Sequence, residues 1–297
     1  MRRVWYNTLV KLYKEKFFMK RKNLAALTAA FAVAVTMTAG CAAVPEKNGD
    51  NDNYEISDEL LVTPEEKPDL TPPEVEKPET PDEQPKPKTI PYISVTTNNV
   101  NIRSGAGTGY AVLGTAEKST LYACLGEENG WYITKYKNKT VYISKKYCVI
   151  VDMQKAGDEV EAVIAEGTRF MGVPYVYGAV RLHDGKGNKL KGFSSNAFDC
   201  SSLMQYMYYY GADTLLDVTT RTQVKQGKTV AKSDLKRGDL MFFTNATRKD
   251  KVGIERIGHV AMYLGDNWIL HTASDYAKIE QISSTRWGYY IQSQRMI

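Results

Sequence analysis

Few residues of this sequence are suited to covalent chemistry, because it holds only four cysteines and three histidines. Cys200 follows Asp199, a residue type that favours the N-cap of a helix. Apolar or aromatic side chains stand at i+3, i+7 and i+10 from it, at Leu203, Met207 and Tyr210. The pattern predicts Cys200 in a first helical turn, where free N–H groups and the helix dipole favour a thiolate nucleophile. The alternative is a small buried side chain on the apolar face of that helix.

Two of the histidines flank a turn. His259 begins one apolar run, 265–267 is a Gly-Asp-Asn turn, and His271 ends the next run. A β-hairpin would place the two histidines opposite or diagonal, with Cβ atoms roughly 4.5–8 Å apart. One could then act as base toward Cys200 while the other fixes its tautomer. A zinc site is a weaker alternative, since no carboxylate has matching spacing. His183, in a glycine-rich loop, is expected to be solvated.

The elements that must position these residues follow a helix-then-strand order. Helices are predicted over about 157–171 and from Asp199 to Gly211, which is a suitable C-terminal stop. The order predicts an α+β domain over 152–297. Strands are predicted over 240–243, 259–264, 268–271 and 289–295.

This segment resembles the NlpC/p-sixty family of papain-like cysteine peptidases, over essentially all of 155–297. The matching stretches, in the family's order, are GVPYVYG at 172–178, DCS at 199–201, RTQVKQG at 221–227, RGDLMFF at 237–243, HVAMYLG at 259–265 and HTAS at 271–274. The departures are Ser202, where the family usually has glycine, and two longer loops, at 180–198 and 245–257. Both loops are expected to border the cleft.

The resemblance implies the roles of the site residues. Cys200 would be the nucleophile, His259 the base and His271 the orienting residue. Tyr175 would lie beside the oxyanion site and Asp199 would bind the free amine of the substrate, and Ser201 is placed with them in the substrate-binding set. The family cuts the bond between γ-D-glutamate and the diamino acid of peptidoglycan stem peptides. No cofactor and no metal are expected.

The N-terminal third predicts export. A basic segment, Met19–Lys22, precedes an Ala-rich run, and Met19 is an alternative start of translation. Thr38-Ala39-Gly40-Cys41 then resembles a lipoprotein signal, so 1–40 are expected to be a signal peptide and Cys41 the lipidated residue. Residues 41–89 carry most of the chain's prolines among acidic residues and are predicted to be a disordered tether. The predicted location is the extracellular face of a bacterial membrane.

Residues 90–151 predict a small β-barrel, from short strands separated by glycine- and asparagine-rich turns. The stretches NVNIRSG at 99–105 and GWY at 130–132 resemble a bacterial SH3-like domain. We expect it to pack near the cleft. Cys124 and Cys148 within it are either two buried thiols or one disulfide bridge.

The charge of the sequence limits the classes of partner that the protein is expected to bind. The net charge is +5, and the folded part has no arginine-rich block, which argues against nucleic acid. Peptidoglycan stem peptides and the membrane are the expected partners of a monomer. Two alternatives to hydrolysis remain: an acyltransferase that uses the same cysteine, and an inert wall-binding lipoprotein.

Overall fold

The computed structural model describes residues 88–297, so the predicted signal, Cys41 and almost all of the tether lie outside the described residues. The described residues belong to one compact unit. Its strands make one nine-stranded sheet and one five-stranded sheet. Among residues 88–297 no helix is long and apolar enough to cross a membrane.

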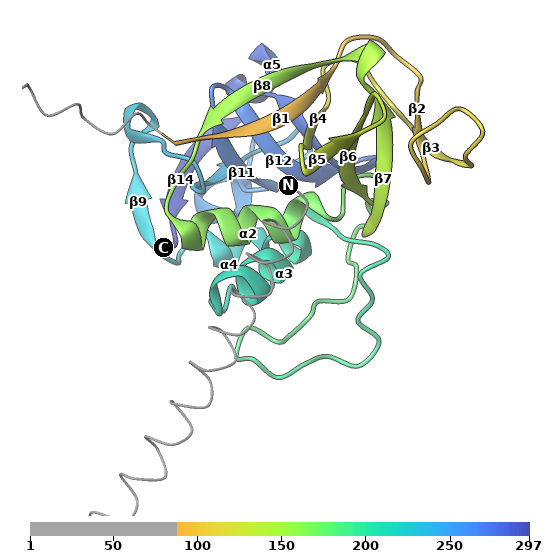
Figure 1. Cartoon of the computed structure of the whole chain (residues 1–297). Helices are drawn as coiled ribbons and strands as arrows, with labels where there is room; N and C mark the ends of the chain where they lie inside the picture. The colour runs from red at the N-terminus through yellow and green to blue at the C-terminus, as the bar shows by residue number, and fades with distance from the viewer. Residues whose placement is uncertain (1–87) are drawn as a thin grey trace, which may run out of the picture. The chain divides into compact units, whose positions relative to one another are not determined.

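The N-terminal part of this unit is built of strands (Figure 1). They are β1 (Thr89–Val95), β2 (Val100–Arg103), β3 (Val112–Ala116), β4 (Leu121–Ala123), β5 (Gly126–Glu128), β6 (Trp131–Tyr136), β7 (Lys139–Ser144) and β8 (Cys148–Gln154), with the 3₁₀ turn η1 (Lys145–Tyr147) before β8. Burial alternates along β6, as expected for a strand with one face on a core. Lys137 and Asn138 join β6 to β7 with φ of 49° and 60°, the left-handed pair that a two-residue hairpin requires.

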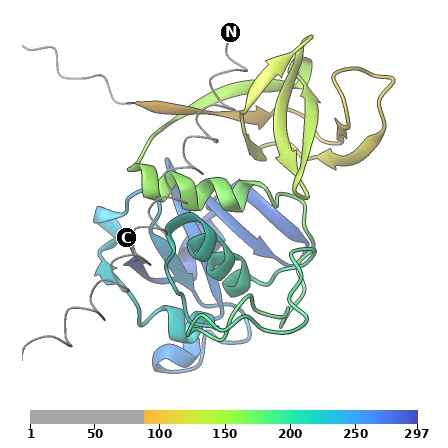
Figure 2. The ribbon, with the colours of Figure 1, turned by 60° about the horizontal axis from the view of Figure 1, so that its bottom comes forward.

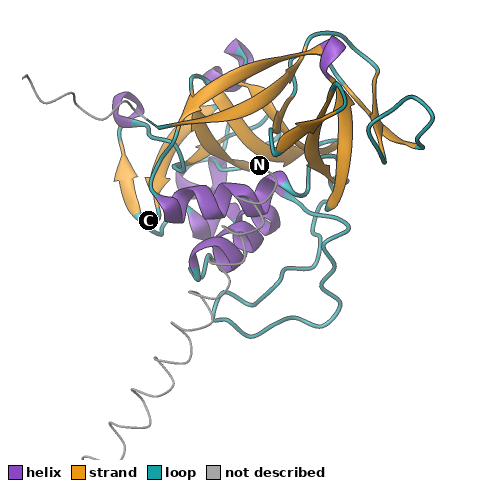
Figure 3. Ribbon diagram, viewed as in Figure 1, coloured by secondary structure: helices purple, strands orange, loops and turns teal. Residues whose placement is uncertain are grey.

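The C-terminal part holds the helices and the remaining strands, coloured by type in Figure 3. They are α2 (Asp158–Thr168), α3 (Cys200–Ala212), α4 (Thr220–Gln223), β9 (Lys228–Val230), η2 (Lys232–Asp234), β10 (Leu240–Phe243), η3 (Gly253–Arg256), β11 (His259–Gly265), β12 (Trp268–Ala273), β13 (Tyr276–Gln281), α5 (Ser284–Gly288) and β14 (Tyr290–Arg295). The nine-stranded sheet has the order β8-β1-β4-β13-β12-β11-β10-β14-β9, and the five-stranded sheet has the order β3-β2-β7-β6-β5. The α+β class predicted from the sequence is confirmed. The predicted first helix ends earlier than expected, because the chain tightens into a turn in which the Phe170 N–H bonds the Gly167 carbonyl.

Helices α2 and α3 pack against each other (Figure 2), and α3 contacts β11 and β12. The two helices approach so closely that a Cβ on Gly211 would lie 2.4 Å from the Cα of Val163. Only glycine fits at this crossing. It sets the position of α3, and therefore of Cys200 at its first residue.

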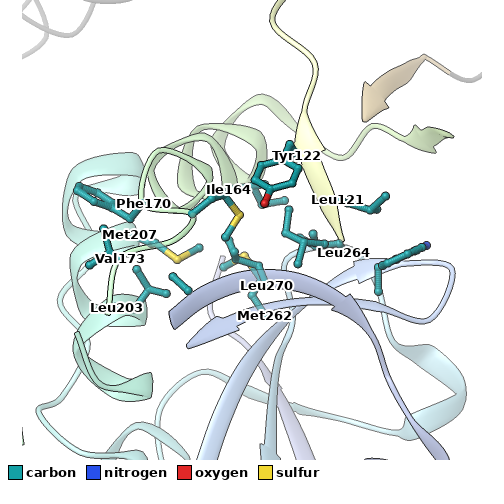
Figure 4. Packing of buried hydrophobic residues seen from close by; sticks show 14 of the residues in the cluster. Leu121, Tyr122, Ile164, Phe170, Val173, Leu203, Met207, Met262, Leu264 and Leu270 are labelled. Carbon is teal, nitrogen blue, oxygen red and sulfur yellow. The ribbon is translucent and has the colours of Figure 1, made fainter. Parts of the chain in front are cut away.

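One core joins both parts of the unit (Figure 4). Ile164 of α2, Leu203 of α3 and Leu270 of β12 pack with Leu121 and Tyr122 of β4, all 3% exposed or less. Leu121 also pairs with Ile279 of β13, so the large sheet runs from the barrel strands into the C-terminal strands. A single core predicts that the two parts unfold together.

The barrel also contacts the segment that leads to Tyr175. The backbone N–H groups of Lys137 and Asn138 donate to the carbonyls of Met171 and Arg169, at 2.8 and 2.7 Å. Gly172 has a φ of +79°, and the Tyr136 ring packs against it so closely that a Cβ at this position would lie 2.0 Å from a ring atom. The β6–β7 turn therefore holds the chain just before Pro174 and Tyr175.

Two sequence predictions about single residues have clear outcomes. His183 is fully buried, so the expectation that it is solvated is wrong. Its loop folds back on itself, and the His183 backbone N–H and carbonyl both bond the Gln205 side chain of α3, at 3.4 and 3.2 Å. Cys124 and Cys148 are two free thiols, each half-buried.

Candidate active site

Cys200 is the first residue of α3, and Asp199 is its N-cap. The Asp199 carboxylate accepts from the Ser202 N–H at 2.8 Å, and the Ser202 hydroxyl accepts from the Asp199 N–H at 2.9 Å. This reciprocal pair is a capping box, which typically contributes about 1 kcal/mol per cap. Serine at 202, noted above as a departure from the family pattern, thus fixes the helix start beside the thiol.

The environment of the thiol differs from the sequence expectation. Burial raises the pKa of Cys200 to about 12, and the nearby Asp199 carboxylate adds to this effect. The backbone N–H groups of Val260 and Ser201 and the charge of Arg181 act in the opposite direction but do not offset burial. The surroundings of the thiol therefore disfavour the thiolate that the helix N-terminus alone was expected to favour.

The two histidines meet as predicted from the hairpin. Met262 of β11 pairs with Leu270 of β12, so His271 lies diagonally across from His259. The Nε2 of His259 and the Nδ1 of His271 are 3.0 Å apart. His259 begins the strand whose next residue, Val260, points its N–H at the Cys200 thiol. The structure therefore links His259 to His271, and it places His259 next in sequence to the backbone N–H that bonds the Cys200 thiol.

Burial disfavours the charged form of both rings. Burial, followed by the second ring and the charge of Arg286, places the pKa of His259 well below 6.5. Burial also lowers the pKa of His271, although its hydrogen bond to Glu280 acts in the opposite direction. A neutral imidazole beside a neutral thiol can act as a general base during attack, without a preformed ion pair.

Glu280 is a site residue that the sequence analysis missed. Its Oε1 lies 3.0 Å from the Nε2 of His271 and 2.9 Å from an Nη2 of Arg286. Burial alone would raise the pKa of Glu280, but the His271 hydrogen bond and the nearby cations bring it to about 2. Glu280 lies on β13, a strand that was not predicted. The alternation in YAKIEQ, with Ala277 and Ile279 buried, was the signal for it.

Arg181 is the second missed residue, and it comes from the long loop 180–198. Its Nη2 lies 2.7 Å from Asp199 Oδ2 and donates to the Ser201 hydroxyl at 3.2 Å. Ser201 in turn donates to Asp199 Oδ1 at 3.1 Å, and the Gly178 N–H reaches Oδ2 at 3.3 Å. Both carboxylate oxygens of Asp199 are thus engaged, and the residue is only 4% exposed. A substrate amine would have to compete with Arg181 for it.

Tyr175 lies near Cys200 and Asp199. It is half-buried, its N–H donates to the Asp275 carbonyl at 2.9 Å, and it bridges to Phe198. Burial raises the pKa of Tyr175 to about 12, and the neighbouring Cys200 and Asp199 contribute to this rise. The Tyr175 hydroxyl is therefore a neutral hydrogen-bond donor close to the thiol.

A hollow of about 690 Å³ lies at the other end of β11, and its lining contains none of these residues. Both of its arginines are already paired, since Arg237 binds Glu161 at 2.7 Å and Arg295 binds Asp239 at 2.8 Å. Within the described part of the chain, no group of three or more His, Cys, Asp or Glu side chains could hold a metal ion.

The comparisons with known proteins agree with this architecture. Residues 172–296 match the model of the NlpC/P60 family, and residues 98–148 match that of the bacterial SH3 domain. The chain therefore contains an NlpC/P60 domain preceded by a bacterial SH3 domain.

Curated relatives share the matched region. A gamma-D-glutamyl-L-lysine dipeptidyl-peptidase of Bacillus subtilis is 28% identical over 170 residues, which cover 57% of this chain and 50% of the relative. The peptidoglycan DL-endopeptidase CwlO of Bacillus licheniformis is 32% identical over 134 residues, 44% of this chain and 26% of the relative. The chain thus spans half or less of the length of these relatives.

Among solved structures, an NlpC/P60 family protein from Bacillus cereus aligns with a TM-score of 0.38 at 21% identity, over 69% of this chain and 63% of that one. The peptidoglycan hydrolase RipB from Mycobacterium tuberculosis aligns with a TM-score of 0.37 at 27% identity, over 47% of this chain and 65% of that one.

Proposed function

We propose that this protein is a thiol peptidase that hydrolyses peptidoglycan stem peptides at the bond between γ-D-glutamate and the diamino acid. The observation that carries the proposal is the buried cluster in which Cys200 opens a helix beside the linked pair His259 and His271. The relatives support the substrate class, because they include a peptidoglycan endopeptidase and a gamma-D-glutamyl-L-lysine dipeptidyl-peptidase.

The geometry suggests how such a site would work. His259 accepts the thiol proton as Cys200 Sγ attacks the amide carbonyl, so no resting thiolate is needed. The tetrahedral oxyanion forms near the start of α3, where the Cys200 N–H and the Tyr175 hydroxyl are donors. His259 then gives its proton to the leaving amine, which leaves a thioester on Cys200. Water, deprotonated by His259, hydrolyses the thioester and frees the γ-carboxylate.

The test is mass spectrometry of L-Ala-γ-D-Glu-diamino acid tripeptides incubated with the full chain. The proposal predicts L-Ala-D-Glu and the free diamino acid as products. Unchanged peptide would favour the inert wall-binding alternative, and a conjugate with an added amine would favour an acyltransferase. Cys200→Ala is the matched control and should leave the peptide intact.

The roles of the two histidines differ in this mechanism. His259→Ala should lower kcat/KM by roughly 10²–10⁴-fold, because the proton transfers are lost. His271→Asn and His271→Gln can keep one hydrogen bond to His259, so both should retain more activity than His271→Ala. Every His271 variant should exceed His259→Ala, and the reverse order would mean that the two histidines have exchanged roles.

The proposed location is the outer face of the bacterial membrane, through a lipid on Cys41. The support is the lipoprotein-like Thr38–Cys41 stretch behind a basic and apolar leader. Cys41→Ala should move the protein from the membrane fraction to the medium. A variant that stays in the membrane fraction would show that the apolar run is retained as a membrane helix.

A further inference from the structure

The buried polar chain of the site does not end at His271. His259 Nε2 contacts His271 Nδ1 at 3.0 Å, and His271 Nε2 contacts Glu280 Oε1 at 3.0 Å. His271 is fully buried between these two partners. Three side chains from neighbouring strands, β11, β12 and β13, therefore form one line of hydrogen bonds that leads away from Cys200.

The protons along this line can be assigned from the chemistry of its far end. An ionised carboxylate has no proton to donate, so the proton between Glu280 and His271 belongs to His271 Nε2. A neutral imidazole carries a single N–H, which leaves a lone pair on His271 Nδ1. His259 Nε2 must then be the donor to His271, and the lone pair of His259 lies on Nδ1.

We propose that Glu280 is a positioning residue that fixes the tautomers of both histidines and leaves His259 Nδ1 as the base for Cys200. This inference rests on the proposed function and deepens it. The carboxylate has a second effect, because its charge stabilises the positive charge that His259 gains during attack. The sequence motifs end at 274, so Glu280 lies outside them.

The neighbouring charges allow a sharp test. The groups that face the histidine pair are Glu280 and Lys278 of β13 and Arg286 of α5, and Lys278 is itself bound to Asp275 at 2.8 Å. Glu280 favours a charged His259, and Arg286 opposes it. Removing one or the other should therefore shift the titration of His259 in opposite directions.

The first measurement needs no substrate. Nitrogen-15 NMR of histidine side chains reports which ring nitrogen is protonated, and the chain has only three histidines to assign. The wild type should show the Nε2–H tautomer for His259 and His271. Glu280→Gln keeps an acceptor oxygen and should keep both tautomers, whereas Glu280→Leu should lose the fixed tautomer of His271. Glu159→Gln, which removes an exposed carboxylate on α2, is the matched control.

The second measurement is the pH dependence of kcat/KM on the tripeptide. Glu280→Gln should lower the plateau about tenfold and move its acid limb to lower pH, and Glu280→Leu should lower it by on the order of a hundredfold. Arg286→Gln should move the acid limb to higher pH. A role in folding alone would give losses without these opposite shifts.

The outcomes separate the two proposals. A Nδ1–H tautomer on wild-type His259, or acid limbs that do not move in Glu280→Gln and Arg286→Gln, would overturn the role of Glu280. If Glu280→Leu does not fold, these two variants still decide the question. Fixed tautomers together with no cleavage of any stem peptide would overturn the proposed function and leave the positioning role of Glu280 intact.

Discussion

Replacing Arg181 with methionine tests whether the long loop is part of the site. Arg181→Met keeps much of the side-chain volume but leaves Asp199 without its cationic partner, in a position where its side chain is 6% exposed. Breaking a buried ion pair by removing one partner costs about 3–5 kcal/mol. Asp199 keeps three hydrogen-bond donors, from Gly178, Ser201 and Ser202, so the lower end of that range is expected.

The assay is urea unfolding of the full chain, with the variants made singly and together. A loss of about 3 kcal/mol corresponds to a fall in Tm of roughly 6–12 °C for a unit of this size. In an Asp199→Asn background the same Arg181→Met change should cost much less, because no buried carboxylate is left unpaired. Lys155→Met, which removes an ion pair to the exposed Asp158, is the control and should cost under about 1 kcal/mol.

The Arg181 variant also has a consequence for substrate choice. Free of Arg181, the Asp199 carboxylate can bind a cationic amine, so Arg181→Met should favour tripeptides with a free N-terminus over N-acetylated ones more strongly than the wild type does. Equal unfolding costs of Arg181→Met in both backgrounds would refute the claimed ion-pair coupling. An unchanged ratio of kcat/KM for the two peptides would refute the link to substrate binding.

Three further predictions follow from burial and charge. Burial holds the pKa of His259 well below 6.5, so the acid limb of the kcat/KM profile should have its midpoint below pH 6.5, with a plateau through neutral pH. A midpoint of this limb above pH 7 would contradict a neutral thiol and a neutral imidazole. A histidine whose pKa is lowered by folding contributes stability above its unfolded pKa, so the free energy of unfolding of the wild type should fall as pH drops below about 6.5. His271→Asn should weaken this pH dependence in urea unfolding at pH 5 and pH 7. Leu121→Ala in the barrel should cost about 2–5 kcal/mol and lower one shared calorimetric transition, whereas two separate transitions would show that the barrel and the C-terminal part unfold independently.

Much of this fold could be predicted because the spacing of apolar residues and the helix-capping residues indicate its helices and strands. The helix that begins at Cys200 was predicted from Asp199 and the apolar positions behind it, and the structure adds Ser202 as the second member of its capping box. The hairpin of His259 and His271 was predicted because a Gly-Asp-Asn turn lies between two apolar runs, and the structure resolves the open choice between opposite and diagonal histidines as diagonal. In both cases the signal is local in sequence.

The missed parts depend on contacts between distant segments. Arg181 meets Asp199 only because the long loop folds back over the start of α3, and no spacing in the sequence encodes that approach. The burial of a residue also depends on distant segments. A helix N-terminus favours a thiolate, but the surrounding core raises the pKa of Cys200 to about 12. His183 was expected in solvent for the same reason, since only the folded loop shows that it is covered.

The measurement that tests the central claim most directly is cleavage of the tripeptide in oxygen-18 water. If Cys200 attacks the γ-carbonyl and water then hydrolyses the thioester, the L-Ala-D-Glu product of the wild type should carry heavy oxygen in its γ-carboxylate, and Cys200→Ala should form no product. Product formed by Cys200→Ala at the wild-type rate, or heavy oxygen at any other position, would contradict the account.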